Sequence, residues 1–120
     1  MSFRAASTVV AALAGAAFLA GPPAHAASFN CGKPRYADER AICASRALND
    51  RDVTMSLLFD LDRSFLAMGG RGALTDGQAA WLRQRRACGS NRSCLARLYD
   101  RRIAELRTVI DKQVIPNGPF

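Results

Sequence analysis

Apolar residues recur at the spacing of helical faces through most of the chain, and no stretch alternates with the period of two that strands require. Residues 36–46 form a first short helical stretch. Asn49 is a good N-cap for a second helix, which is expected to end in a loose turn at the glycine-rich residues 69–72. The apolar positions of this second helix are Val53, Met55, Leu57, Leu58, Phe59, Leu61, Phe65 and Leu66.

Two further helices follow. Thr75 and Gln78 have the spacing of a capping box, and the helix they begin is expected to stop at Gly89. After a polar turn, a last helix carries one apolar stripe and is broken by Pro116. The stripe consists of Leu95, Leu98, Tyr99, Ile103, Leu106, Val109 and Ile110. The pattern predicts an all-α fold, a small bundle of three to four helices in which the last two form an antiparallel hairpin.

The N-terminus has the features of a secretion signal. Arg4 precedes an apolar run at residues 9–20, and Ala24-His25-Ala26 supplies a small-x-small cleavage pattern. The run is too short for a comfortable membrane span, which disfavours an uncleaved anchor. We therefore expect a signal peptide over residues 1–26, a helical domain over 27–113 and a frayed tail over 114–120. The mature chain is expected to be periplasmic or secreted, without a transmembrane segment.

Four cysteines follow the leader, namely Cys31, Cys43, Cys88 and Cys94. An even number of cysteines in an exported chain indicates a disulfide framework. Of the three possible pairings, proximity in the sequence favours Cys31–Cys43 and Cys88–Cys94, but it does not exclude the others. A metal site is disfavoured, since no Cys-x-x-Cys pair is present and the only histidine lies in the leader.

The chain is basic, with a net charge of +7, and nearly all of its cations are arginines. Such a charge favours anionic partners, for example lipid headgroups or cell-wall polymers, while nucleic acid is not expected in an exported protein's compartment. The alternative is a solvated surface, since arginines alternate with aspartates along the predicted helices. The last two helices carry Arg83, Arg85, Arg86, Arg92, Arg97, Arg101, Arg102 and Arg107.

The cysteine layout and a Gln-x-x-Trp-Leu-x-x-Arg-x-x-Cys run resemble the LprI-type family of lysozyme inhibitors. The resemblance covers almost all of the mature chain. It is carried by residues 28–31, residues 41–43, Gln78 to Leu82, Arg85, residues 87–89, Cys94, Leu95, Tyr99 and residues 102–106. It implies an exported helical domain with the pairs Cys31–Cys43 and Cys88–Cys94, and it implies inhibition of lysozyme.

The chain departs from that family at three places. Tyr36-Ala37 stand where a Thr-Pro start is frequent, Arg51 replaces a leucine, and Arg86 replaces an aspartate. Two of these changes add positive charge. Since animal lysozymes are themselves basic, any inhibition has to use local rather than overall charge complementarity, for instance through an acidic patch around Asp60 and Asp62.

Six residues are candidates for partner binding. Trp81 and Arg85 lie one turn apart and can stack as a surface anchor, although they can equally fill the core of a small bundle. Lys33 and Arg35 precede the first helix and can form a basic loop aimed at a carboxylate cleft. Arg86 and Arg102 complete the set.

Catalysis is not expected. Ser-His-Asp and Cys-His sites need a histidine base, which the mature chain lacks. Asp60 and Asp62 are two positions apart on a helix and point to different faces, which argues against a glycosidase pair. No cofactor or metal is expected. Three kinds of partner are considered. They are lysozyme, another envelope protein of which this chain would be an accessory subunit, and an anionic envelope surface.

Overall fold

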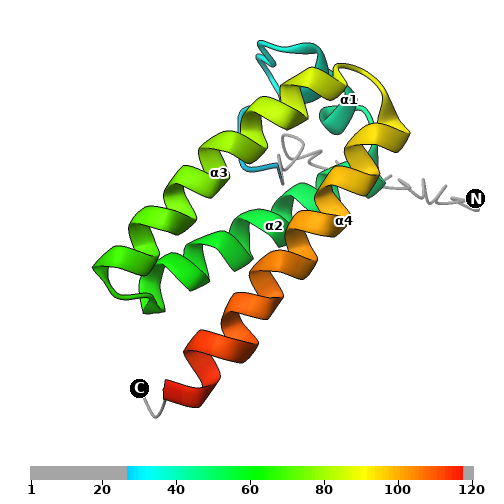
Figure 1. Ribbon diagram of the computed structural model, residues 1–120. Coiled ribbons are helices and arrows are strands. Elements are labelled where there is room, and N and C mark those ends of the chain that lie inside the picture. The colour runs from blue at the N-terminus through cyan, green and yellow to red at the C-terminus, as the bar shows by residue number, and fades with distance from the viewer. Residues whose placement is uncertain (1–26, 118–120) are drawn as a thin grey trace, which may run out of the picture.

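Three long helices run antiparallel to their neighbours in sequence, and a short helix lies at one end of them (Figure 1). The structure is a computed structural model that describes residues 27–117, so the predicted leader lies outside the described residues. Helix α1 spans Ala37–Cys43, α2 Arg46–Phe65, α3 Met68–Cys88 and α4 Arg92–Val109. Residues 27–117 contain helices and connecting loops but no strand, which confirms the predicted all-α class.

Helix α2 begins earlier than Asn49, the predicted cap. Ser45 has an extended backbone and its Oγ accepts a hydrogen bond from the Leu48 amide over 3.4 Å, so Ser45 is the N-cap. The Asn49 amide donates to the Ser45 carbonyl over 2.9 Å, which already closes a helical turn. The prediction of Asn49 was wrong because Ser45 precedes residues 46–48, which have good helix propensity.

Helix α3 also begins earlier than predicted, and residues 69–72 lie inside it rather than in a loose turn. Only Leu66 and Ala67 separate α2 from α3, and both have extended backbones. The Thr75 hydroxyl donates to the Arg71 carbonyl over 2.9 Å, so Thr75 is an interior residue and not the cap of a capping box. Packing of the later part of α3, which includes the buried Leu74, outweighs the low helix propensity of glycine.

The turn between α3 and α4 forms as predicted. Gly89 has a positive φ of 54° and ends α3. Asn91 caps α4, since its Oδ1 accepts from the Cys94 amide over 3.0 Å. The Cys88–Cys94 disulfide joins the two helix ends across this turn, with the Cα atoms 5.7 Å apart.

The second disulfide, Cys31–Cys43, ties the segment before α1 to the last residue of that helix. Both pairings agree with those that the resemblance implies. Disulfides persist in oxidising compartments, so the folded chain belongs to one. No helix within residues 27–117 has the length and apolar character that a membrane crossing requires.

The core lies where α4 packs along α2 and α3, with α1 closing one end. The predicted stripe of α4 is confirmed at Leu95, Leu98, Tyr99 and Leu106, which are all at most 4 % exposed. The stripe of α2 is only partly buried, because three long helices leave its outer side uncovered. The fully packed residues of the cluster are Ala41, Ile42, Leu48, Met55, Leu74, Trp81, Leu95, Leu98, Tyr99 and Leu106.

Residues 114–117 of the predicted frayed tail are helical, and residues 118–120 lie outside the described residues. Helix α4 continues into a π-helical turn, η1 at Ile110–Val114, and a 3-10 turn, η2 at Ile115–Asn117. Val114 is 6 % exposed. Pro116, the predicted breaker, lies inside η2 and follows the last α-helical turn.

Candidate functional site

Trp81 lies in the core. Its side chain is 4 % exposed, its Nε1 donates to the Leu98 carbonyl over 3.3 Å, and its ring meets the Tyr99 ring edge-on at 5.0 Å between centroids. Of the two interpretations that the sequence allowed for Trp81, the structure shows the core residue. Its ring does not lie on the surface that a partner would contact.

Arg85 is the centre of a buried ionic cluster. Its Nε donates to Asp38 Oδ2 over 2.8 Å, and its Nη1 lies 3.5 Å from Asp52 Oδ1. All three residues are at most 4 % exposed. The guanidinium also lies 5.1 Å from the centre of the Phe29 ring and 5.8 Å from that of Trp81. Arg85 therefore joins α3 to α1 and α2, and its charge is compensated inside the protein.

Tyr99 completes this cluster from α4. Its hydroxyl donates to Asp52 Oδ1 over 2.7 Å, and the Ser28 amide donates to Asp52 Oδ2 over 2.6 Å. Burial raises the pKa of the Tyr99 phenol, and the negative charge of Asp52 raises it further, so Tyr99 stays protonated and serves as a donor. These contacts fasten the segment before α1 onto α2.

Sequence reasoning missed Asp38 and did not foresee the burial of Asp52. Asp52 lies in the core with no exposed surface. For Asp38 one signal was available, because it lies one turn before Ile42 and so shares the buried side of α1.

Arg102 belongs to a second polar cluster, between α2, α3 and α4. Its Nε donates to Gln78 Oε1 over 3.0 Å and its Nη1 to Glu105 Oε2 over 3.1 Å, while Arg102 itself is 8 % exposed. Asp62 is fully buried on α2, and neither of its carboxyl oxygens has a hydrogen-bond partner within residues 27–117. Burial raises the pKa of Asp62 from 3.8 to about 6, although the positive charge of Arg102 lowers it.

The burial of Asp62 also corrects an expectation about the surface. Asp60 is exposed and pairs with Arg63 at 3.7 Å, whereas Asp62 has no exposed surface. The two carboxylates do point to different faces, as predicted, but they form no joint acidic patch for a basic lysozyme.

The other candidate residues lie at the surface beside an exposed tyrosine. We define the N-terminal basic surface as Lys33, Arg35, Tyr36 and Arg86. Lys33, Arg35 and Arg86 are exposed, and Tyr36 is 41 % exposed. The Arg86 guanidinium lies 4.1 Å from the centre of the Tyr36 ring, which joins the loop before α1 to α3. This surface therefore contains three of the six candidate residues, Lys33, Arg35 and Arg86.

The loop that carries this surface is held at several points. Glu39 Oε2 accepts from the Arg35 amide over 2.6 Å and from the Tyr36 amide over 3.3 Å. Glu39 Oε1 lies 3.9 Å from the buried Arg85 guanidinium. Together with the Cys31–Cys43 disulfide, these contacts fix the backbone beneath the exposed cations.

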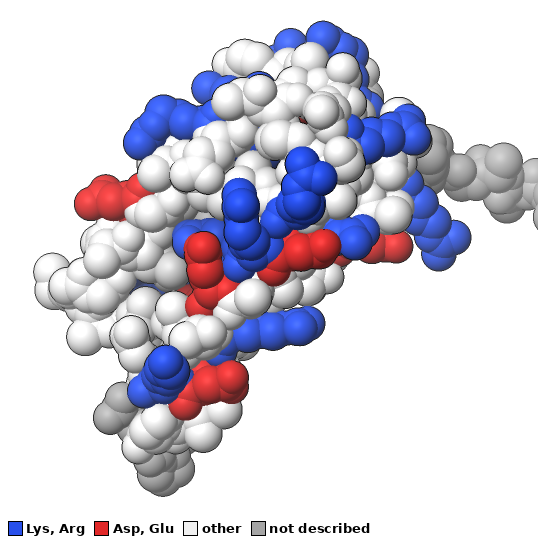
Figure 2. Space-filling view, turned by 45° about the vertical axis from the view of Figure 1, so that its right-hand side comes forward, with Lys and Arg blue, Asp and Glu red and all other residues white. Residues whose placement is uncertain are grey.

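The other basic residues are mixed with acidic ones on the face that Figure 2 shows. There Lys and Arg are spread over the surface with Asp and Glu between them. Arg51 is partly exposed and pairs with Asp100 on α4 at 2.8 Å. This mixing fits the solvated interpretation for much of the surface.

One side of α2 exposes apolar side chains. Leu57 is 66 % exposed, Leu61 and Phe65 are each 43 % exposed, and Met68 at the start of α3 is 88 % exposed. The first three are spaced four residues apart and share one helix face. We call these four residues the α2 apolar stripe.

Comparisons with known proteins identify no relative, since no family model, no curated protein and no solved structure matches this chain significantly.

Proposed function

We propose that this chain is an exported, non-catalytic binding protein of the lysozyme-inhibitor type, which presents the N-terminal basic surface to the carboxylate cleft of a muramidase. The observation that carries the proposal is the fixed loop with Lys33 and Arg35 exposed on it. In this proposal the signal peptide is cleaved after Ala26, and the mature protein acts in the periplasm or outside the cell.

The charge of the surface suits such a cleft. Glycoside hydrolases of the lysozyme kind carry two carboxyl groups about the bond they cleave. Lys33, Arg35 and Arg86 form no ion pair among the described residues, so their charges are available to an acidic partner. Local complementarity of this kind can act even when both proteins carry a net positive charge.

The rigidity of the loop also supports the proposal. A loop that is already ordered loses little conformational entropy on binding, so more of its contact energy contributes to affinity. Tyr36 adds a half-exposed aromatic ring beside the cations, and Tyr and Arg are common among the residues that dominate binding energy at interfaces. Trp81 and Arg85 then support this surface from the core and do not contact the partner.

The test is lysis of bacterial cell walls by a basic animal lysozyme, with and without the oxidised mature protein, at low and at physiological salt. We expect saturable inhibition that persists at physiological salt. The K33Q/R35Q variant is expected to lose it. The matched control is R83Q/R107Q, which removes the same charge from exposed positions on α3 and α4.

Equal inhibition by K33Q/R35Q and the unchanged protein would contradict this assignment of the surface. Inhibition that is confined to low salt and falls equally in both double variants would indicate coating of the anionic cell wall instead. Absence of inhibition at both salt concentrations would refute the lysozyme-inhibitor function.

The α2 apolar stripe favours a second function, that of an accessory subunit of another envelope protein. Exposed apolar residues grouped on one helix face are typical of protein interfaces. In this case the L57E/L61E variant should lose a specific cross-linked complex in the cell envelope while its effect on lysozyme stays unchanged. A complex that survives L57E/L61E would refute this role.

A further inference from the structure

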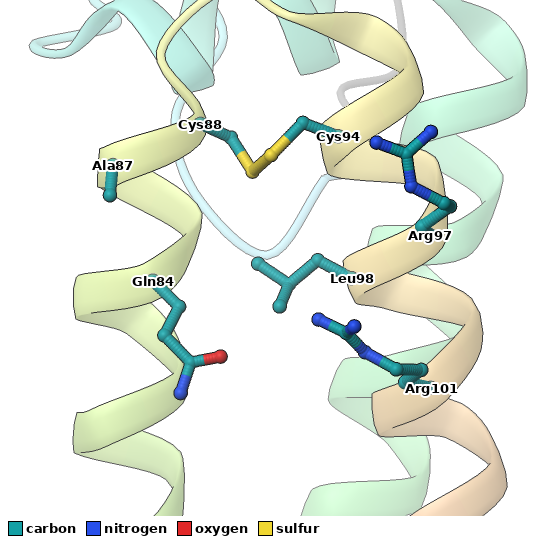
Figure 3. A pocket seen from close by; sticks show the side chains of 7 residues that line it. All are labelled: Gln84, Ala87, Cys88, Cys94, Arg97, Leu98 and Arg101. Carbon is teal, nitrogen blue, oxygen red and sulfur yellow. A yellow bond between two sulfur atoms is a disulfide. The ribbon is translucent and has the colours of Figure 1, made fainter.

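A groove of about 370 Å³ lies between α3 and α4 beside the Cys88–Cys94 disulfide (Figure 3). Arg97, Leu98 and Arg101 line it from α4, and Gln84 lines it from α3. In Figure 3 the side chains of Leu98 and Arg101 extend from α4 toward α3, and the Gln84 amide extends toward α4. The groove thus combines two cations, one neutral amide and an apolar floor.

The two arginines carry uncompensated charge. They are one helical turn apart and exposed, and within residues 27–117 neither forms an ion pair. Like charges at this spacing repel each other. The nearby carboxylates are engaged elsewhere, since Asp100 pairs with Arg51 and Glu105 pairs with Arg102. An anion between Arg97 and Arg101 would relieve this repulsion.

The groove continues along the same two helices. A second hollow of about 210 Å³ shares Gln84, Leu98 and Arg101 with the first. Its lining also includes Trp81 and the ion pair of Arg102 with Glu105, so it offers the second half of the ligand a region without net charge from that pair. The disulfide holds the helix ends 5.7 Å apart at its Cα atoms, which fixes the spacing of α3 and α4 beside the groove. The site is therefore long enough for a charged group together with a short uncharged body.

We propose that this groove binds a phosphate ester of a small polyol. The planar guanidinium groups of Arg97 and Arg101 match phosphate oxygens in charge and in bidentate geometry. Ala87 and the disulfide offer apolar surface to a carbon chain, with the nearly buried Leu98 beneath it, and Gln84 can donate to or accept from a hydroxyl group. The same chemistry is present in a free glycerol phosphate and in the headgroup of an anionic phospholipid. The proposal does not depend on lysozyme binding.

The test uses two probes on the oxidised mature protein at physiological salt. The soluble probe is glycerol 3-phosphate, measured by titration calorimetry and by the fluorescence of Trp81, the only tryptophan. The membrane probe is a phosphatidylcholine vesicle with and without phosphatidylglycerol, measured by co-sedimentation. We expect saturable binding to at least one probe, weakened at least about tenfold in R97Q/R101Q because charge-assisted hydrogen bonds are lost.

The matched control is R92Q/R107Q, which removes the same charge from exposed positions of α4 outside the groove lining. Retained binding by this control supports the groove. Saturable binding of glycerol 3-phosphate assigns the site to free esters, and binding of phosphatidylglycerol vesicles alone assigns it to lipid headgroups. Equal weakening in both double variants, or no binding to either probe, would overturn the proposal. Circular dichroism of each variant verifies the fold.

Discussion

Arg85 on α3 donates from Nε to Asp38 on α1 over 2.8 Å, and both side chains are at most 5 % exposed. These residues are 47 positions apart in the sequence, so the ion pair joins the small first helix to the bundle. The same helix begins just after Lys33 and Arg35. The buried pair therefore lies beneath the surface on which the proposed function depends.

Replacing Arg85 with methionine should destabilise the protein strongly. R85M leaves two buried carboxylates, Asp38 and Asp52, without their cation, and breaking a buried pair in this way costs about 3–5 kcal/mol. The measurement is unfolding in urea followed by circular dichroism. The exposed neighbour gives the control, because R86M should change stability by less than about 1 kcal/mol. A small loss in R85M would mean that the cluster contributes little.

Asp62 should make stability depend on pH. Its pKa is about 6 in the folded protein against 3.8 ordinarily, so the folded state binds more protons between these values. Stability from this group is therefore present below about pH 4 and is lost as pH rises through about 6. D62N should stabilise the protein at pH 7 by up to about 3 kcal/mol and change little at pH 4.

The measurement for Asp62 is the difference in unfolding free energy between D62N and the unchanged protein across pH 4 to 8. D60N is the control, because Asp60 is exposed on the same helix and should show no such difference. A difference for D62N that is constant with pH would show that Asp62 has an ordinary pKa in the folded protein.

Two glycines should respond in opposite ways to alanine. Gly72 lies within α3 with no atom within 4 Å of an added Cβ, so G72A should stabilise the protein by about 0.5–1 kcal/mol. Gly89 has a φ of 54°, so G89A should destabilise it by about 1–2 kcal/mol. Thermal melting measures both. Destabilisation by G72A would argue for a turn at residues 69–72 and against the observed start of α3.

Removal of the Cys31–Cys43 disulfide should separate stability from function. On the loop-entropy model C31S/C43S costs about 3 kcal/mol and C88S/C94S about 2 kcal/mol, since the closed loops differ in length. At a temperature where both variants stay folded, only C31S/C43S should weaken lysozyme inhibition, because it frees the loop with Lys33 and Arg35. Equal inhibition by both variants would show that the disulfide is not needed to hold this loop for binding.

The sequence predicted the end of helix α3 but not its start. The stop at Gly89 followed from a single residue whose backbone freedom the turn needs. The start of α3 did not follow, because three glycines and a plausible capping box at Thr75 all pointed to a later start. Only the packing of Leu74 and the residues beyond it outweighs those local preferences.

The sequence likewise placed some of the candidate binding residues and left the location of others open. Lys33, Arg35 and Arg86 were identified from charge and position, and they do lie at the surface. Trp81 and Arg85 carried both a surface and a core interpretation. Trp is common in interfaces and in cores alike, and Arg, which is frequent at interfaces, can also be buried when carboxylates pair with it, so residue type could not decide between the two interpretations.

By itself, the sequence determined the helical class, the hairpin of α3 and α4 and the positions of the cysteines, because these depend on local periodicity, turn chemistry and spacing. Only the tertiary structure decided which charges are buried. Arg85 and Arg86 are adjacent, yet Arg85 meets Asp38 and Asp52 in the core while Arg86 stacks on Tyr36 at the surface. That difference depends on the orientation of α3 against α1 and α2, which long-range packing sets and which no local pattern encodes.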